Sequence, residues 1–366
     1  MKLNPTSRQL LKAATLLMAA SACLVAQRKK APELTGTIAF DVDSRSGRVE
    51  TMEVVIGDGG AGPYKAVLTG APSLPTHAIY RPRNLQPFSK ANPLPVVAFA
   101  NGGCRNTSGE FRNFLSDIAS HGFLVVSIGP AGNSVVMGSE ERTNTTNSSQ
   151  LLDGVNWAIA ENDRNGGEFY QKIAVTRIAV MGQSCGGGQA VDVSLDPRVT
   201  TTVVLNQGVN MSQETRPLGG VAGQQNRGTG AAAAPDRYAP FAPTLMRAPV
   251  TPDSATPIAA PNRVEILGKL HAPILFLNGG PKDSGFANAK ANFEFIQHVP
   301  VALAHQDVGH YPATYRQPNG GAFAKAVGAW LQWQLKGNET ARKMFAGDSC
   351  GLCKDPSWTL ERKKIN

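Results

Sequence analysis

The chain has 366 residues, of which 42% are hydrophobic and 17% are charged, and this is enough apolar material for one large core. Its net charge of +9 would favour an acidic partner, but six basic residues and no acidic residue lie in the first 30 positions. Without those six residues the net charge is roughly +3, and no basic stripe is interleaved with aromatic residues. The composition therefore argues against nucleic acid as a partner.

The N-terminus has the pattern of a secretory signal peptide. Three basic residues precede an apolar run over residues 13–26, which is short for a membrane span, and small residues at 20–22 offer a cleavage site. We predict a signal peptide over residues 1–26, a secreted protein and no stable membrane span. A lipid anchor on Cys23 and an uncleaved anchoring helix are the alternatives.

Without Cys23, an even number of cysteines remains, which permits two disulfides in a secreted chain: Cys104, Cys185, Cys350 and Cys353. The last two are spaced as half of a zinc site, but there is no second pair, so we predict no metal. Five sequons would make the chain a glycoprotein if its host is a eukaryote: Asn106, Asn144, Asn147, Asn210 and Asn338.

Short apolar runs alternate with amphipathic helical stretches from about residue 36 onward. Strands are predicted over residues 36–42, 51–56, 76–80, 95–100, 123–128, 178–181, 200–205, 274–277 and 301–305. Helices are predicted over residues 111–120, 148–161, 287–297 and 322–335. This alternation predicts an α/β fold with a mostly parallel central sheet, helices on both of its faces and the early strands at an antiparallel edge.

The alternation breaks down over residues 209–265, where Gly/Ala-rich and Pro-rich stretches flank scattered aromatic residues. Long insertions in compact domains are usually functional or disordered, and we interpret this one as a flexible cap over the site. A surface loop with no role is the alternative. The expected organisation is a single catalytic domain over residues 27–366 that includes this cap and a C-terminal tail over residues 340–366.

The sequence Gly182-Gln183-Ser184-Cys185-Gly186 fits the G-x-S-x-G pattern of a nucleophile elbow. An apolar strand leads into it and small residues follow, which is the strand–turn–helix that an elbow requires. Glycines let the turn hold the serine in a strained conformation, with its hydroxyl exposed at a helix N-terminus. We predict that Ser184 is a nucleophile, and a tight glycine turn without chemistry is the alternative.

A serine hydroxyl needs a base to become a nucleophile. His310 is the best placed of the six histidines, because it lies between the last short strand and the closing helix, whereas its rival His305 is expected to end that strand. Asp283 follows the strand at 274–277 and should orient His310, because Ser–Asp–His is the chain order of α/β hydrolases. Asp307 is too close to His310 in sequence to approach the far side of its ring easily.

An oxyanion hole needs two preorganised donors. We expect one to be the backbone N–H of Cys185, directly after the nucleophile. The other should come from the loop after the strand at 95–100, where we prefer the N–H of Cys104 to that of Gly103. Cys104 and Cys185 would then lie close together, either as a disulfide or as two small buried thiols.

These motifs resemble the dienelactone-hydrolase and cutinase-like (polyester hydrolase) branch of the α/β-hydrolase superfamily. The resemblance covers roughly residues 90–335 and is carried by the elbow, the loop Asn101-Gly102-Gly103, the segment 118–126, Asp283 and His310. It implies the α/β-hydrolase fold and esterase activity without a cofactor. Dienelactone hydrolases use a cysteine nucleophile, whereas Ser184 occupies that position here, so lactone chemistry of their particular kind is in doubt.

We therefore expect a secreted serine hydrolase that cleaves a small-molecule or polymeric carboxylic ester through an acyl-enzyme. Ser184 would attack, His310 would carry the proton and Asp283 would orient His310. The alternatives are a peptidase or amidase on the same triad and a non-catalytic binding protein on a hydrolase fold. The sequence names neither the ester nor the oligomeric state.

Overall fold

The computed structural model describes residues 53–135, 145–212 and 262–366. The expected signal peptide, the strand expected at 36–42 and nearly all of the expected cap lie outside these ranges. No helix within them combines the length and the hydropathy that a lipid bilayer would require.

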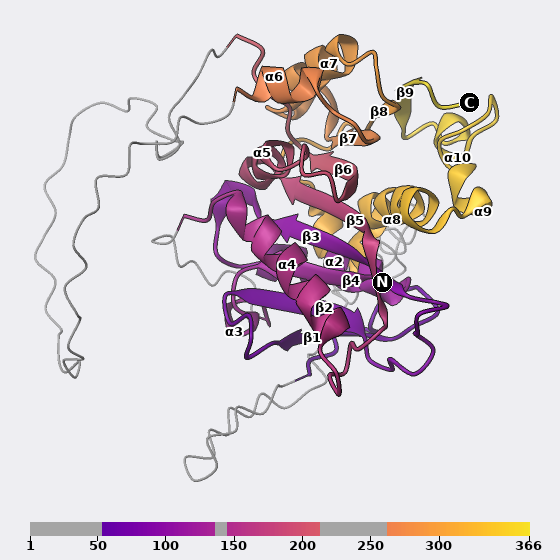
Figure 1. Cartoon of the computed structure of the whole chain (residues 1–366). Coiled ribbons are helices and arrows are strands. Elements are labelled where there is room, and N and C mark those ends of the chain that lie inside the picture. Colours follow the sequence, from indigo (N-terminus) through magenta and orange to yellow (C-terminus); the bar gives the residue numbers. More distant parts are fainter. Residues whose placement is uncertain (1–52, 136–144, 213–261) are drawn as a thin grey trace, which may run out of the picture.

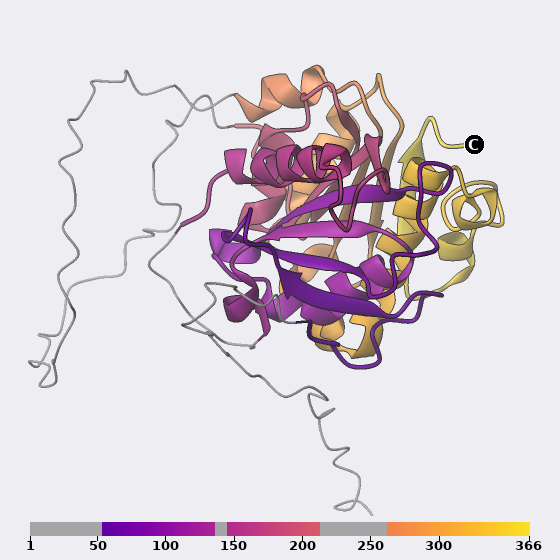
Figure 2. The same ribbon diagram turned by 60° about the horizontal axis from the view of Figure 1, so that its bottom comes forward.

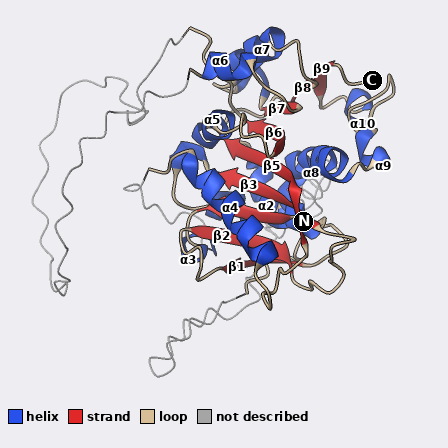
Figure 3. Ribbon diagram, viewed as in Figure 1, coloured by secondary structure: helices blue, strands red, loops and turns tan. Residues whose placement is uncertain are grey.

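The strands of these three ranges form one nine-stranded sheet in the order β1-β2-β4-β3-β5-β6-β7-β8-β9 (Figure 3). Their bounds are β1 (Ala66–Gly70), β2 (His77–Pro82), β3 (Leu94–Ala100), β4 (Leu124–Ile128), β5 (Ile173–Gln183), β6 (Val199–Leu205), β7 (Ile274–Asn278), β8 (Val301–His305) and β9 (Thr359–Lys363). The six strands from β4 across to β8 pair in parallel. The β1–β2, β2–β4 and β8–β9 pairs are antiparallel. The chain is therefore an α/β protein with a mostly parallel sheet.

Helices cover both faces of this sheet, which explains why its central strands read as continuous apolar runs. The helices have the bounds α2 (Arg112–Ser120), α3 (Ala131–Val135), α4 (Ser149–Asp163), α5 (Cys185–Asp192), α6 (Arg263–Gly268), α7 (Phe286–Phe295), α8 (Gly321–Lys336), α9 (Glu339–Arg342) and α10 (Gly351–Lys354). Side chains of α2 and α8 pack with alternate residues of the central strands in one core cluster. Helices α4 to α7 pack on the opposite face, in two further clusters (Figures 1 and 2).

The C-terminal residues, expected as a tail over 340–366 of the same domain, pack into this core. Strand β9 pairs with β8, and the Phe345 side chain is fully buried against Trp330 of α8. A disulfide joins Cys350 to Cys353. The strand at 359–363 was not predicted because three of its five residues, in the sequence TLERK, are charged.

The early edge also differs from the prediction. Within the strand expected at 51–56, the described residues form a single isolated bridge, between Val54 and Leu68. Leu68 belongs to β1, which follows a Gly/Pro-rich turn and was not predicted.

Candidate active site

Ser184 lies at the carboxyl end of β5 and directly precedes α5. Its backbone has φ 52° and ψ −119°, a conformation that non-glycine residues adopt only where the surroundings hold it. Part of that support comes from the neighbouring strand, because the Ser184 N–H donates to the carbonyl of Leu205 at 2.8 Å. The strand–turn–helix expected from the sequence is therefore present at this residue.

The two glycines of the G-x-S-x-G sequence are required by close backbone contacts. A Cβ atom on Gly182 would lie 2.1 Å from the carbonyl oxygen of Gly186. A Cβ on Gly186 would lie 2.2 Å from the carbonyl oxygen of Ala100, at the end of β3. A side chain on Gly182 would therefore distort the elbow itself, and one on Gly186 would force the elbow away from the end of β3.

The structure brings Ser184, His310 and Asp283 together in a continuous hydrogen-bonded chain. Nδ1 of His310 lies 2.6 Å from Oδ1 of Asp283, and Nε2 lies 2.9 Å from Oγ of Ser184. Because an ionised carboxylate can only accept, Nδ1 carries the ring proton and Nε2 is free to accept the serine proton. This is the arrangement that a general base requires.

The Asp283 side chain is fully buried, and burial alone would raise the pKa of its carboxyl. Hydrogen bonds from His310, from the backbone N–H groups of Gly279 and Gly285, and from Asn206 outweigh that effect. Together they lower the pKa of Asp283 to about 2. The carboxyl is therefore ionised at neutral pH despite its burial.

Asn206 is a site residue that the sequence reasoning missed. Its Nδ2 donates to Oδ2 of Asp283 at 2.8 Å, and its Oδ1 accepts from the Tyr315 hydroxyl at 2.6 Å. Tyr315 is buried, and both its burial and the negative charge of Asp283 raise its pKa well above the usual value. Asn206 directly follows β6 at the same edge as the other strand ends, which is the signal that could have revealed it.

Backbone contacts fix the loop that carries His310. The N–H of Gly309 donates to the carbonyl of Gly279 at 2.8 Å, and a Cβ on Gly279 would lie 1.8 Å from the Gly309 oxygen. The buried Gln183, directly before the nucleophile, donates its side-chain amide to the carbonyl of His310 at 3.1 Å. Gln183 therefore links the elbow to the histidine loop, a role the sequence pattern did not indicate.

The rival residues have other partners. His305 is the last residue of β8, and its ring contacts the ring of Phe286 in α7. Burial lowers the pKa of His305. Asp307 pairs with Lys282 at 2.8 Å. Among the described residues, the hydrogen bonds and ring contacts of Ser184 and His310 do not involve either side chain.

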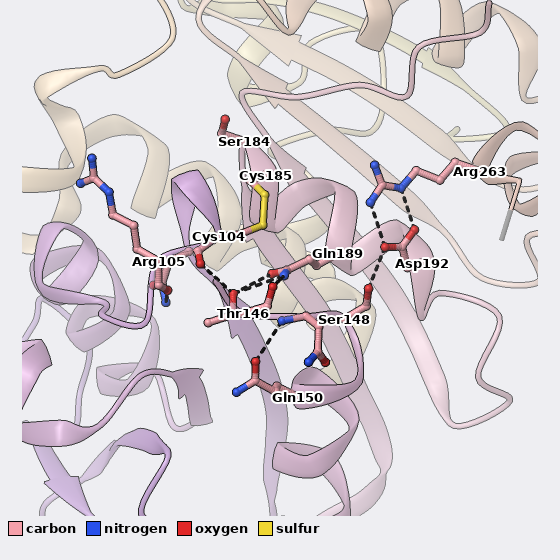
Figure 4. The surroundings of a disulfide bond; sticks show 12 residues. Cys104, Arg105, Thr146, Ser148, Gln150, Ser184, Cys185, Gln189, Asp192 and Arg263 are labelled. Atoms are coloured by element: carbon pink, nitrogen blue, oxygen red, sulfur yellow. Dashed lines mark hydrogen bonds and ion pairs between the residues drawn. A yellow bond between two sulfur atoms is a disulfide. The ribbon is translucent and has the colours of Figure 1, made fainter. Parts of the chain in front are cut away.

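The oxyanion donors expected from the sequence lie beside the nucleophile. Cys185 is the first residue of α5, so its N–H is one of those that a helix leaves without an internal partner. Gly103 and Cys104 end a short 3-10 turn (Gly102–Cys104), with φ 66° and φ 50°. A disulfide joins Cys104 to Cys185, which settles the pairing left open by the sequence (Figure 4).

Two exposed apolar side chains lie close to His310 in the sequence. Tyr311 is 71% exposed, and its ring stands edge-on to the His310 ring at 4.6 Å. Val308 is also exposed. Across the described ranges, no group of three or more His, Cys, Asp or Glu side chains is arranged to hold a metal ion.

No protein-family model matches the chain, and no curated protein matches it. A serine hydroxyl on a strained elbow, a histidine in position to accept its proton and a buried carboxylate behind that histidine form a group suited to nucleophilic attack on a carbonyl carbon.

Proposed function

We propose that the chain is a serine hydrolase of the α/β-hydrolase superfamily that cleaves a carboxylic ester. The observation that carries this proposal is the hydrogen-bonded chain from Asp283 through His310 to Ser184, on an elbow between β5 and α5. The mostly parallel sheet and the Ser–Asp–His order along the chain also support it. The resemblance to dienelactone-hydrolase and cutinase-like enzymes remains part of the proposal.

In the proposed reaction, Oγ of Ser184 attacks the ester carbonyl carbon while Nε2 of His310 takes the hydroxyl proton. His310 then gives that proton to the leaving alcohol as the bond to the alkoxy oxygen breaks and an acyl-enzyme remains. Water, deprotonated by His310, attacks the acyl carbon, and the serine leaves with the proton. Asp283 stabilises the imidazolium in both halves of the reaction.

The negative oxygen of each tetrahedral intermediate needs preorganised donors. We assign these to the backbone N–H of Cys185 and to an N–H of Cys104 or Gly103. One such donor is typically worth about 3 kcal/mol of transition-state stabilisation. The exposed side chains of Tyr311 and Val308 favour an ester with an apolar group next to the carbonyl.

Secretion is part of the same proposal. The two disulfides support it, because such bonds persist mainly in oxidising compartments. Intact mass of the protein recovered from the medium tests it: a chain lacking about the first 26 residues is expected, and an uncleaved chain retained in the cell would contradict it.

Hydrolysis of p-nitrophenyl acetate, butyrate and octanoate tests the ester assignment, with p-nitroanilides of matched acyl groups beside them. We expect turnover of the esters, little turnover of the anilides and loss of both in a Ser184→Ala variant of equal folded content. Anilide turnover as fast as ester turnover would favour a peptidase or amidase instead.

A further inference from the structure

One face of α5 contacts the loop after β3 and the residues just before α4. Cys185, Gln189 and Asp192 are spaced i, i+4 and i+7, so they lie in a row along the helix. Cys185 is bonded to Cys104, and Oδ2 of Asp192 accepts from the Ser148 hydroxyl at 2.7 Å. Figure 4 shows this row, with the Ser184 side chain on the far side of the disulfide from Gln189.

Gln189, the middle residue of the row, is linked to the oxyanion loop through Thr146. Gln189 is buried and donates its side-chain amide to the carbonyl of Thr146 at 2.8 Å. Thr146 is also buried, and it directs two donors at one oxygen, the carbonyl of Cys104: its N–H at 3.0 Å and its hydroxyl at 3.1 Å.

The contacts of Thr146 with the Cys104 carbonyl restrain a strained part of the backbone. Gly103 and Cys104 both have φ in the left-handed region, and a non-glycine residue keeps such a conformation only where its neighbours hold it. With the Cys104 carbonyl fixed on Thr146, the peptide groups on either side of Cys104 have less freedom to rotate. The loop is thus tied to α5 twice, through the disulfide and through Thr146 and Gln189.

We propose that Thr146 and Gln189 are positioning residues that keep the Gly103–Cys104 backbone in place as an oxyanion donor. This inference rests on the proposed ester hydrolysis. Preorganised donors stabilise charge that develops in the transition state, so a loosened loop should lower kcat more than it changes KM. A role in folding alone would lower Tm without that selective effect.

Thr146→Val is the main test, because it keeps the shape and the backbone N–H and removes only the hydroxyl. The change removes the hydroxyl's bond to the Cys104 carbonyl and its contacts with the Gln189 side chain. We expect kcat for p-nitrophenyl butyrate to fall about tenfold, with KM within about twofold. The inhibition constant of a boronic acid, whose tetrahedral adduct with serine imitates the intermediate, should rise by a similar factor. Gln189→Leu should act in the same direction.

Two variants serve as controls. Thr146→Ser restores the hydroxyl and should return kcat to within about threefold of the wild type. Ser148→Ala removes a contact of the same α5 face that does not reach Cys104, and it should leave kcat and the inhibition constant unchanged.

Equal kcat in Thr146→Val and the wild type would overturn the inference and leave the proposed function standing. A fall in kcat that Thr146→Ser does not reverse, or one shared by Ser148→Ala, would also overturn it. If the wild type neither hydrolyses esters nor reacts with a fluorophosphonate at Ser184, the proposed function fails, and the inference fails with it.

Discussion

Asn206 and Asp283 are joined by a 2.8 Å hydrogen bond to Oδ2, the carboxylate oxygen on the other side from the one that contacts His310. The Tyr315 hydroxyl in turn donates to the side-chain Oδ1 of Asn206 at 2.6 Å. Two buried side chains, of which Tyr315 lies 109 residues from Asn206 in sequence, therefore orient the Asp283 carboxylate on the side away from His310.

Removal of the Asn206 side chain should lower both the free energy of unfolding and the kcat for an ester. Asn206→Gly is the cleanest change, because this residue has φ 50°, which glycine adopts without strain. A hydrogen bond to a charged group contributes about 1.5–3 kcal/mol, so we expect a loss of about that size in urea unfolding. The kcat for an ester should fall about tenfold or more. Tyr315→Phe, which leaves the bond to Asp283 intact, should lower kcat less, and an Asn206→Gly variant as active as the wild type would contradict this account.

Because the pKa of Asp283 is low in the folded protein, the free energy of unfolding should depend on pH in the acid range. A carboxyl whose pKa falls from 3.8 unfolded to about 2 folded stabilises the fold above pH 4, and that contribution is lost as the pH falls toward 2. The shift corresponds to about 2 kcal/mol. Between pH 5 and pH 2 (roughly the window of this titration), the free energy of unfolding should drop by about that much more in the wild type than in Asp283→Asn. Parallel curves for the two proteins would contradict the prediction.

The close approach at Gly186 predicts a strong effect of a single methyl group. Gly186→Ala would place Cβ 2.2 Å from the Ala100 oxygen, and we expect destabilisation of about 3 kcal/mol and loss of ester turnover. Gly328→Ala in α8 is the matched control, because its Cβ would make ordinary contacts at 3.7 Å and 3.9 Å. That variant should be stabilised by up to about 1 kcal/mol. Thermal melts of the two variants compare the effects, and equal Tm values would show that the elbow is not so tightly packed.

The two disulfides should differ in their effect on stability and activity. Cys104 and Cys185 are 81 residues apart, so loss of their bond should cost about 4 kcal/mol, against about 2 kcal/mol for the three-residue separation of Cys350 and Cys353. Paired serine substitutions at each disulfide, compared by urea unfolding, measure this. Only the substitutions at Cys104 and Cys185 should also lower kcat, because of the two disulfides only this one joins the oxyanion loop to α5. The opposite order of the two effects would contradict the assignment.

Much of the fold follows from apolar patterning, because strands buried on both faces leave a continuous signal. The strand predicted at 301–305 has those bounds as β8, and the closing helix differs from α8 by one residue at each end. The charged β9 carries no such signal, and β1 has only three apolar residues in a row. A short window of sequence does not show which distant strand will pair with such a segment.

The members of the triad were identifiable because each follows a strand that the pattern reveals. Asn206 also follows a strand, β6, but an amide side chain at a strand end indicates no catalytic role by itself. Thr146 and Gln189 could not be predicted, since the contacts with Cys104 and with each other join segments more than 40 residues apart. Pairings of this kind depend on how the loops pack at the strand ends, which periodicity does not encode.

Fluorophosphonate labelling followed by peptide mass spectrometry tests whether Ser184 is the nucleophile. We expect one adduct on the wild-type protein, on the peptide that contains Ser184, and no adduct on Ser184→Ala. Labelling should also slow strongly in His310→Ala, whose serine lacks the base at 2.9 Å. An unlabelled wild-type protein, or an adduct that persists in Ser184→Ala, would contradict the assignment of Ser184 as the nucleophile.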